Sequence, residues 1–407
     1  MKKKIGIVGW LLLVYLFVSA GCQKETTEVP APKIAEPDHL VSATQVAIIP
    51  QNVLQTLATR QGFAKFIPQI KHDVAVYNLV YTTTYKGKEQ QASGLLAVPQ
   101  NMTTPAPLLS TQHGTMFLDA DAPTNFPNTF SGFELFAATG YITLIPDYLG
   151  YGISKDVFHP YYDQKHSGLV VVDMIKAVKS YANNQKIKLN NNLFLVGYSE
   201  GGYVTMAAQK EIETHPEHGL KVTAAAEGAG GYDLTGMLAA VTSGQNYGNP
   251  SYLAFVLQSY NTTYNWNRPL TDFFQEPYAT RIPELFNGAS GASKINNSLS
   301  KNPAELFNPT FYAELQKPDG EKALKQALVA NSFLNWVPQS PTRLYHGTAD
   351  QSVFFQTSQT VYDRFKAAGA PSVEFISIPG GTHSSSLEPM ILLVIPWIQS
   401  LNGGVSQ

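Results

Sequence analysis

The sequence predicts an α/β fold with a mostly parallel sheet, helices on both faces and a helical cap. First, short apolar stretches typical of buried strands alternate with helical patterns along most of the 407 residues. Second, residues 233–339 interrupt this alternation, because they carry helical patterns and many aromatic residues but no clear strand. We therefore expect a core of residues 46–232 and 340–407, with residues 233–339 inserted between two strands as a cap or lid.

The N-terminus has the features of an export signal. A run of lysines follows the first Met, residues 5–18 are apolar but too few to span a membrane comfortably, and Ser-Ala-Gly-Cys22 comes next. Residues 1–22 resemble a bacterial lipoprotein signal. The resemblance implies an exported protein whose lipidated Cys22 holds it on a membrane surface, on the periplasmic or the cell-surface face. A simple secretory signal and a short anchor are the alternatives. Residues 23–45 are polar and rich in Pro and Glu, which predicts a flexible tether.

The composition excludes several classes of function. Charged residues make up 14% of the chain, against about 25% in typical globular proteins, and they form no basic stripe. Together with the lack of zinc-finger spacing, this argues against a nucleic-acid partner. Cys22 is the only cysteine, so neither an intrachain disulfide nor a cysteine nucleophile in the body of the protein is expected.

The elements can be placed in order from their apolar patterns. Residues 52–66 have a weak helical pattern, and Val74–Tyr85 and Gln91–Pro99 predict a hairpin that begins the sheet, with a turn at Lys86-Gly87-Lys88. The other strands are expected at 108–110, 141–145, 193–196, 222–227, 343–346 and 373–378. The helices of the core are expected at 133–138, 163–181, 204–208 and 390–401.

Residues 192–203, NLFLVGYSEGGY, combine a strand, a sharp turn and the start of a helix. Gly197 and Gly201 lie two residues on either side of Ser199, where a side chain would crowd the turn. Gly-x-Ser-x-Gly in this setting is the nucleophile elbow of α/β-hydrolases, in which a strained backbone lifts the hydroxyl clear of the sheet. We expect Ser199 to be a nucleophile. The alternative is a glycine-rich turn whose Ser has no catalytic task.

A nucleophilic Ser needs a base and a group that orients this base. In α/β-hydrolases the order along the chain is Ser, acid, His. Asp350 follows the strand at 343–346, at the sheet edge where the other strand ends deliver their groups. His383, just past the last expected strand, is the only His that follows Asp350 in the sequence. We expect Asp350 to be the acid and His383 the base, with Asp147 and Asp233 as competing candidates for the acid.

Two backbone N–H groups are expected to form an oxyanion hole. One is that of Glu200, the residue after the nucleophile. The other should come from the loop after the strand at 108–110, where we expect the amide of Thr115, with Gly114 second. The side chains of Glu200 and His113 need no chemical role.

Four short motifs carry a resemblance to a known family: His113-Gly114-Thr115, Pro146-Asp147-Tyr148-Leu149-Gly150-Tyr151-Gly152, Gly197-Tyr198-Ser199-Glu200-Gly201-Gly202 and His346-Gly347-Thr348-Ala349-Asp350. They resemble the secretory-lipase-like branch of the α/β-hydrolases, over roughly residues 70–400. The resemblance implies Ser199 as nucleophile, Asp350 as acid and His383 as base. It also implies a helical cap that shapes the acyl or alcohol pocket. Fungal members are lipases, and many bacterial relatives are carboxylesterases.

These observations predict a serine carboxylic-ester hydrolase of the carboxylesterase or lipase type. It would act on small-molecule esters through an acyl-enzyme intermediate, with neither a metal nor an organic cofactor. One alternative is a serine exopeptidase of the prolyl-peptidase type, in which acids such as Asp272, Glu276 and Glu284 would bind the substrate amine. A second alternative is a lipoprotein that binds a ligand on a hydrolase fold without catalysis.

Overall fold

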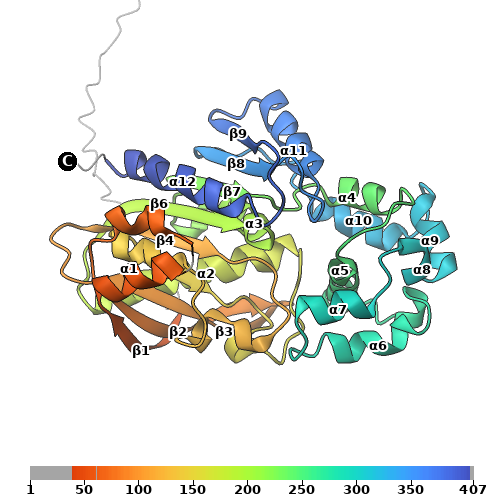
Figure 1. Cartoon of the computed structure of the whole chain (residues 1–407), viewed down its shortest axis with the longest axis horizontal. Coiled ribbons are helices and arrows are strands. Elements are labelled where there is room, and N and C mark those ends of the chain that lie inside the picture. Colours follow the sequence, from red (N-terminus) through yellow and green to blue (C-terminus); the bar gives the residue numbers. More distant parts are fainter. Residues whose placement is uncertain (1–38, 61, 404–407) are drawn as a thin grey trace, which may run out of the picture. The chain divides into compact units, whose positions relative to one another are not determined.

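The computed structural model describes residues 39–60 and 62–403, which are built around one nine-stranded sheet (Figure 1). The strands lie in the order β1-β2-β3-β5-β4-β6-β7-β8-β9. Their bounds are β1 Leu40–Ile49, β2 Val74–Tyr85, β3 Lys88–Pro99, β4 Ala106–Gln112, β5 Ile142–Pro146, β6 Leu189–Tyr198, β7 Ala224–Gly228, β8 Thr342–Gly347 and β9 Val373–Ile378. The pairs β1–β2, β2–β3 and β3–β5 are antiparallel, and all pairs from β5 to β9 are parallel. The predicted mostly parallel sheet is therefore confirmed.

Helices cover both faces of this sheet, which explains why its central strands read as continuous apolar runs. Successive side chains of a strand point to opposite faces. Thus Leu195 of β6 packs on the face covered by α2 (Gln164–Asn184), α3 (Glu200–Thr214) and α11 (Phe355–Ala367). Its neighbours Phe194 and Val196 pack on the other face, with α1 (Gln51–Arg60) and α12 (Leu387–Leu401).

Between β7 and β8 the chain leaves the sheet and forms the cap. Its helices are α4 Leu234–Val241, α5 Pro250–Thr263, α6 Tyr278–Leu285, α7 Ala292–Ser298, α8 Pro303–Leu306, α9 Pro309–Gln316 and α10 Lys322–Ala330. The predicted helical character is confirmed, while the division of the chain into domains at 233 and 339 stays a prediction. Many cap aromatics form its own core: Phe273, Phe274 and Phe311 are fully buried against one another.

The sheet begins earlier than the sequence predicted. Residues 40–45, assigned to the flexible tether, form the first part of β1, so the hairpin of β2 and β3 does not begin the sheet. The tether prediction is wrong for these residues. An edge strand needs no apolar face, and most of β1 is exposed, so its sequence lacks a strong strand pattern. The rest of the predicted tether up to residue 38, and Cys22, lie outside the described residues.

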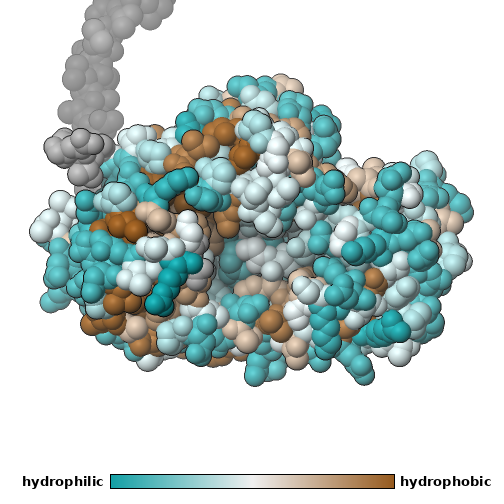
Figure 2. All heavy atoms as spheres, viewed as in Figure 1, coloured by the Kyte–Doolittle hydropathy of each residue, from teal (hydrophilic) through white to brown (hydrophobic). Residues whose placement is uncertain are grey.

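A hollow opens on the face shown in Figure 2, between the core elements and the cap helices. The surface around it mixes polar and apolar residues. Among the helices within residues 39–60 and 62–403, none combines the length and apolar content needed to cross a membrane.

Candidate active site

Ser199 lies at the sharp turn between β6 and α3, in a backbone conformation that most residues avoid. Its φ is 61° and its ψ is −128°, and it begins α3 as the N-terminal cap residue. The turn leaves no space for neighbouring side chains. A Cβ on Gly197 would lie 2.1 Å from the carbonyl oxygen of Gly201, and one on Gly201 would lie 1.9 Å from that of Gln112. The glycines of the motif are therefore required by the geometry of the turn.

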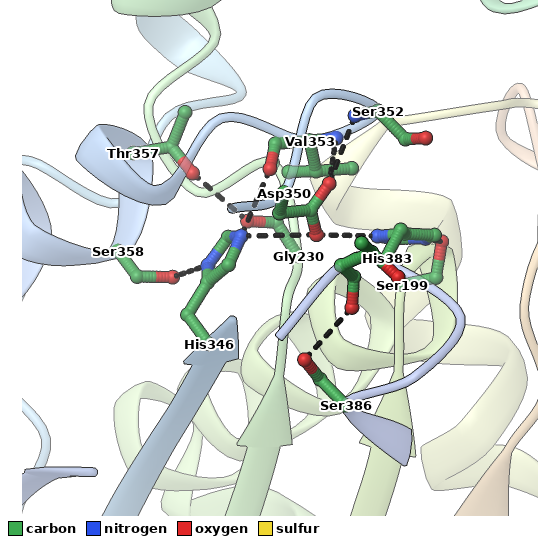
Figure 3. A network of polar contacts seen from close by, with 12 residues as sticks. Ser199, Gly230, His346, Asp350, Ser352, Val353, Thr357, Ser358, His383 and Ser386 are labelled. Atoms are coloured by element: carbon green, nitrogen blue, oxygen red, sulfur yellow. Dashed lines mark hydrogen bonds and ion pairs between the residues drawn. The ribbon is translucent and has the colours of Figure 1, made fainter. Parts of the chain in front are cut away.

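Three side chains from distant parts of the sequence lie in a row at the carboxyl ends of the parallel strands (Figure 3). The Oγ of Ser199 is 2.8 Å from Nε2 of His383. The Nδ1 of His383 is 2.6 Å from Oδ2 of Asp350. In the tautomer that fits these contacts, Nδ1–H donates to the carboxylate, and Nε2 accepts the hydroxyl proton of Ser199. The structure thus brings together the three residues that the sequence predicted to converge.

Asp350 is held as a carboxylate by several donors. Its side chain is fully buried, and Oδ1 accepts hydrogen bonds from the backbone N–H groups of Ser352 at 2.8 Å and Val353 at 3.0 Å. Burial alone would raise the pKa of Asp350, but the hydrogen bonds from His346, His383 and the Val353 amide hold it well below its usual range. A carboxylate that stays ionised can orient the His383 imidazole and stabilise its protonated form.

A second histidine, which the sequence did not reveal as part of the site, lies beside Asp350. His346, at the end of β8, is fully buried, and its Nε2 is 3.3 Å from the same Oδ2 that His383 contacts. Its other nitrogen, Nδ1, is 2.7 Å from Oγ of Ser358 on α11 (Figure 3). The only signal in the sequence is that His346 precedes Asp350 by four residues in the loop motif.

The loop after β4 lies against the Ser199 side chain. A Cβ built on Gly114 would be 3.5 Å from Cβ and 3.9 Å from Oγ of Ser199. Thr115, the next residue, lines a cavity together with Ser199. Glu200 is the first residue of α3, so its N–H is one of the four that have no partner within a helix. These positions are compatible with the predicted oxyanion hole, and the roles of the three amides stay predictions.

The side chain of Glu200 has a structural contact that the sequence did not reveal. Its Oε1 is 2.7 Å from Nε2 of His159, and both side chains are almost fully buried. The Nδ1 of His159 is 2.6 Å from the carbonyl oxygen of Leu149. This pair therefore ties the start of α3 to the loop that follows β5.

The two competing acids are occupied elsewhere. Asp147 accepts hydrogen bonds from the hydroxyls of Ser93 and Thr124, each at 2.6 Å. Asp233 caps the N-terminus of α4, where Oδ1 accepts from the N–H of Gly236 at 2.9 Å. Neither is a hydrogen-bond partner of His383, so Asp350 is the acid that the geometry favours.

Two cavities adjoin this cluster. One, of about 460 Å³, contains Ser199 and His383 and has apolar walls from Phe63 and Phe66, residues 133–136 and α12. The other, of about 100 Å³, lies under the cap and is lined almost entirely by apolar side chains of α4, α5, α9 and α10. Tyr252 lines both.

The side chains with metal-ligand spacing, Glu211, His215 and His218, lie at the far end of α3, away from Ser199.

Residues 134–401 match the family model described as secretory lipase. The chain is 26% identical over 277 residues to Lipase 6 of Candida albicans, covering 65% of this chain and 56% of that protein. It is 22% identical over 246 residues to the secreted triacylglycerol lipase LIP2 of Malassezia furfur, covering 59% of this chain and 49% of that protein. The chain therefore spans about half the length of the curated relatives it matches.

Solved structures show the same architecture. A ligand-bound form of the rice cell wall degrading esterase LipA from Xanthomonas oryzae is similar with a TM-score of 0.79 and 25% identity, over 90% of this chain and 98% of that chain. Candida antarctica lipase A in its closed state is similar in fold, with a TM-score of 0.66 and 16% identity, over 91% of this chain and 84% of that chain. The protein has the α/β-hydrolase fold and belongs to the secretory lipase family.

Proposed function

We propose that the protein is a serine carboxylic-ester hydrolase of the carboxylesterase or lipase type. The observation that carries this proposal is the continuous hydrogen-bond chain from Ser199 through His383 to Asp350, at 2.8 and 2.6 Å. Membership of the secretory lipase family supports the same reaction class.

In the first half of the proposed reaction, Oγ of Ser199 attacks the carbonyl carbon of the ester while its proton moves to Nε2 of His383. Asp350 keeps the imidazole in the required tautomer and stabilises its positive charge. The negative oxygen of the tetrahedral intermediate is stabilised by the N–H groups of Glu200 and Thr115 or Gly114, each contributing about 3 kcal/mol. His383 then gives the proton to the leaving alcohol oxygen as the carbon–oxygen bond breaks, which leaves an acyl-enzyme on Ser199.

In the second half, water attacks the acyl carbon and gives its proton to His383. The new tetrahedral intermediate collapses, the bond to Oγ of Ser199 breaks, and the proton returns from His383 to Oγ. A carboxylic acid leaves and the starting state is restored, so no redox partner is needed.

The cavities support an ester substrate over a peptide. The residues lining the cavity at Ser199 and the apolar cavity under the cap include no Asp or Glu. An exopeptidase would need buried acids there to bind the substrate amine. The cap acids named as candidates are engaged elsewhere or exposed: Asp272 pairs with Arg268, and Glu276 bonds Thr280. We infer that the acyl chain extends from Ser199 towards the apolar cavity under the cap.

A short-chain nitrophenyl ester tests the proposal. The wild-type protein should release nitrophenol, and Ser199→Ala should retain less than about a thousandth of kcat, a loss expected for a catalytic nucleophile. Ser384→Ala is a matched control, because it removes an exposed hydroxyl from the same cavity. Equal activity in wild type and Ser199→Ala would refute the assignment. Cleavage of dipeptide anilides in preference to esters would favour the exopeptidase.

We also propose that the protein is exported and anchored by lipid on Cys22, as the N-terminal sequence predicts. In cells, Cys22→Ser should move the protein from the membrane fraction to the soluble fraction. If the variant stays in the membrane fraction, the lipid on Cys22 is not what holds it there.

A further inference from the structure

We propose that Glu211, His215 and His218 bind one Zn²⁺ ion at the C-terminal end of α3. The ligand atoms of these three side chains all lie within 4.8 Å of one another. A single oxygen, Oε1 of Glu211, is 2.9 Å from Nε2 of His218 and 3.3 Å from Nδ1 of His215. Two imidazole nitrogens thus converge on one carboxylate oxygen.

The ligand types suit zinc. Zinc binds imidazole nitrogen at about 2.0–2.1 Å and carboxylate oxygen at about 2.0–2.2 Å, usually with four ligands. Ligand atoms bound to one ion at these distances lie about 3.3–3.5 Å apart in a tetrahedron, close to the Glu211–His215 separation of 3.3 Å. Two His and one Glu supply three ligands, and water completes the set.

The backbone holds the three residues in place. Glu211 is on the last turn of α3, and His215 directly follows this helix and still bonds its backbone N–H to the carbonyl oxygen of Glu211 at 3.1 Å. Pro216–His218 form a single 3₁₀ turn that begins with proline, whose fixed φ stiffens the turn, and Gly219 closes it with a φ of 62°. Few backbone changes are needed to bring the ligands together.

The surroundings leave room for the ion and its water. Glu211 and His215 line a cavity of about 410 Å³ between α2, α3 and the end of α10. Lys210 lines the same cavity, where its Nζ is 2.5 Å from the amide oxygen of Gln164 and its charge interacts with Glu211.

The position of the site indicates a structural role. Glu211 is twelve residues after Ser199 on the same helix, which is about 18 Å at 1.5 Å per residue. The ion would join the last turn of α3 to the segment that leads to β7. We therefore expect zinc to stabilise the fold and to leave ester hydrolysis unchanged, so this inference does not depend on the proposed function.

The test uses the full chain without a histidine tag, freed of metal with a chelator. Titration with ZnCl₂ in a calorimeter should give one site of micromolar or tighter Kd, and saturating zinc should raise the melting temperature. His215→Ala and Glu211→Gln should each weaken binding at least tenfold and abolish this rise. His72→Ala is the matched control, because it removes an imidazole from another part of the core. It should change neither the zinc affinity nor the rise in melting temperature that zinc produces.

Bound Co²⁺ gives a readout that does not depend on stability. Its visible absorption should show a four-coordinate site in the wild type and in His72→Ala, and this signal should be absent in His215→Ala. His215 is exposed, so its loss should leave the protein folded, which circular dichroism checks. Unchanged zinc affinity in His215→Ala and Glu211→Gln, or no binding by the wild type at micromolar zinc, would overturn the proposal.

Discussion

The imidazole Nε2 of His346 lies 3.3 Å from Oδ2 of Asp350, on the carboxylate oxygen that also contacts His383. The same nitrogen is 2.9 Å from the carbonyl oxygen of Val353, so its N–H is shared between two acceptors. On the other side of the ring, Nδ1 accepts the hydroxyl proton of Ser358 at 2.7 Å. Both nitrogens of His346 are thus committed to holding the Asp350 loop, which makes His346 a positioning residue.

Replacing His346 by Ala should lower kcat about tenfold with little change in KM. The reason is that Asp350 loses one donor and orients His383 less well, and a tenfold loss corresponds to about 1.4 kcal/mol in the barrier. His346→Gln, whose amide can donate to the same carboxylate, should recover part of the rate. Steady-state kinetics on a nitrophenyl ester measure this, and melting curves show whether stability changes. If the Gln variant is no more active than the Ala variant, His346 does not act by donating a hydrogen bond to Asp350.

Glu227 should make the protein less stable as the pH rises. It lies on β7, between β6 and β8, is fully buried, and neither carboxylate oxygen has a hydrogen-bond partner among the described residues. Burial, with a smaller contribution from Glu213, raises the pKa of Glu227 well above its usual value. The folded protein therefore keeps the proton at pH values where the unfolded chain has lost it. This contribution to stability is complete below the ordinary pKa of Glu and is lost as the pH rises towards the raised one.

Glu227→Gln removes this titration. The melting temperature of the variant minus that of the wild type should therefore increase from pH 4 to pH 8, whatever its sign at pH 4. Glu284→Gln is the control, because it makes the same change of side chain at an exposed position on the cap. A flat difference for Glu227→Gln would show that its carboxyl group is ionised in the folded protein.

Tyr252 should limit the length of the acyl chain. It is the side chain common to the cavity at Ser199 and the apolar cavity under the cap, and its ring stacks at 6.1 Å on that of Phe117. Tyr252→Ala should join the two cavities and raise the activity on octanoyl relative to butyryl esters about tenfold. A few additional methylene contacts in an apolar cavity are enough for a change in specificity of this size. Tyr278→Ala, on a cap helix that lines neither cavity, should leave this ratio unchanged. An unchanged ratio in Tyr252→Ala would place the acyl chain elsewhere.

The parts of the fold that the sequence predicted are those determined by local pattern. Buried strands such as β6 are apolar on both faces, and the turn at Ser199 requires glycine at fixed positions, so both leave strong signals. The exposed edge strand β1 leaves none, and α11 was missed because its buried face includes Thr357 and Ser358, which weaken the apolar pattern of the helix.

The candidate site also has residues that the sequence predicts and contacts that it does not. Ser199, Asp350 and His383 could be predicted because the chain order and the strand ends restrict the choice to few residues. The contacts of His346 with Ser358 and of His159 with Glu200 could not, since each depends on how separate elements pack. The pairing of His159 and Glu200 joins residues 41 positions apart, and no local pattern encodes it.

In the proposed mechanism His383 and Asp350 activate the hydroxyl of Ser199, and covalent labelling tests this activation most directly. The full-length protein is treated with a fluorophosphonate, digested, and mapped by mass spectrometry. We predict one adduct, on Ser199, formed at least a hundredfold more slowly in His383→Ala and absent in Ser199→Ala. An unlabelled protein, an adduct on another residue, or labelling at the same rate without the His383 imidazole would contradict the account.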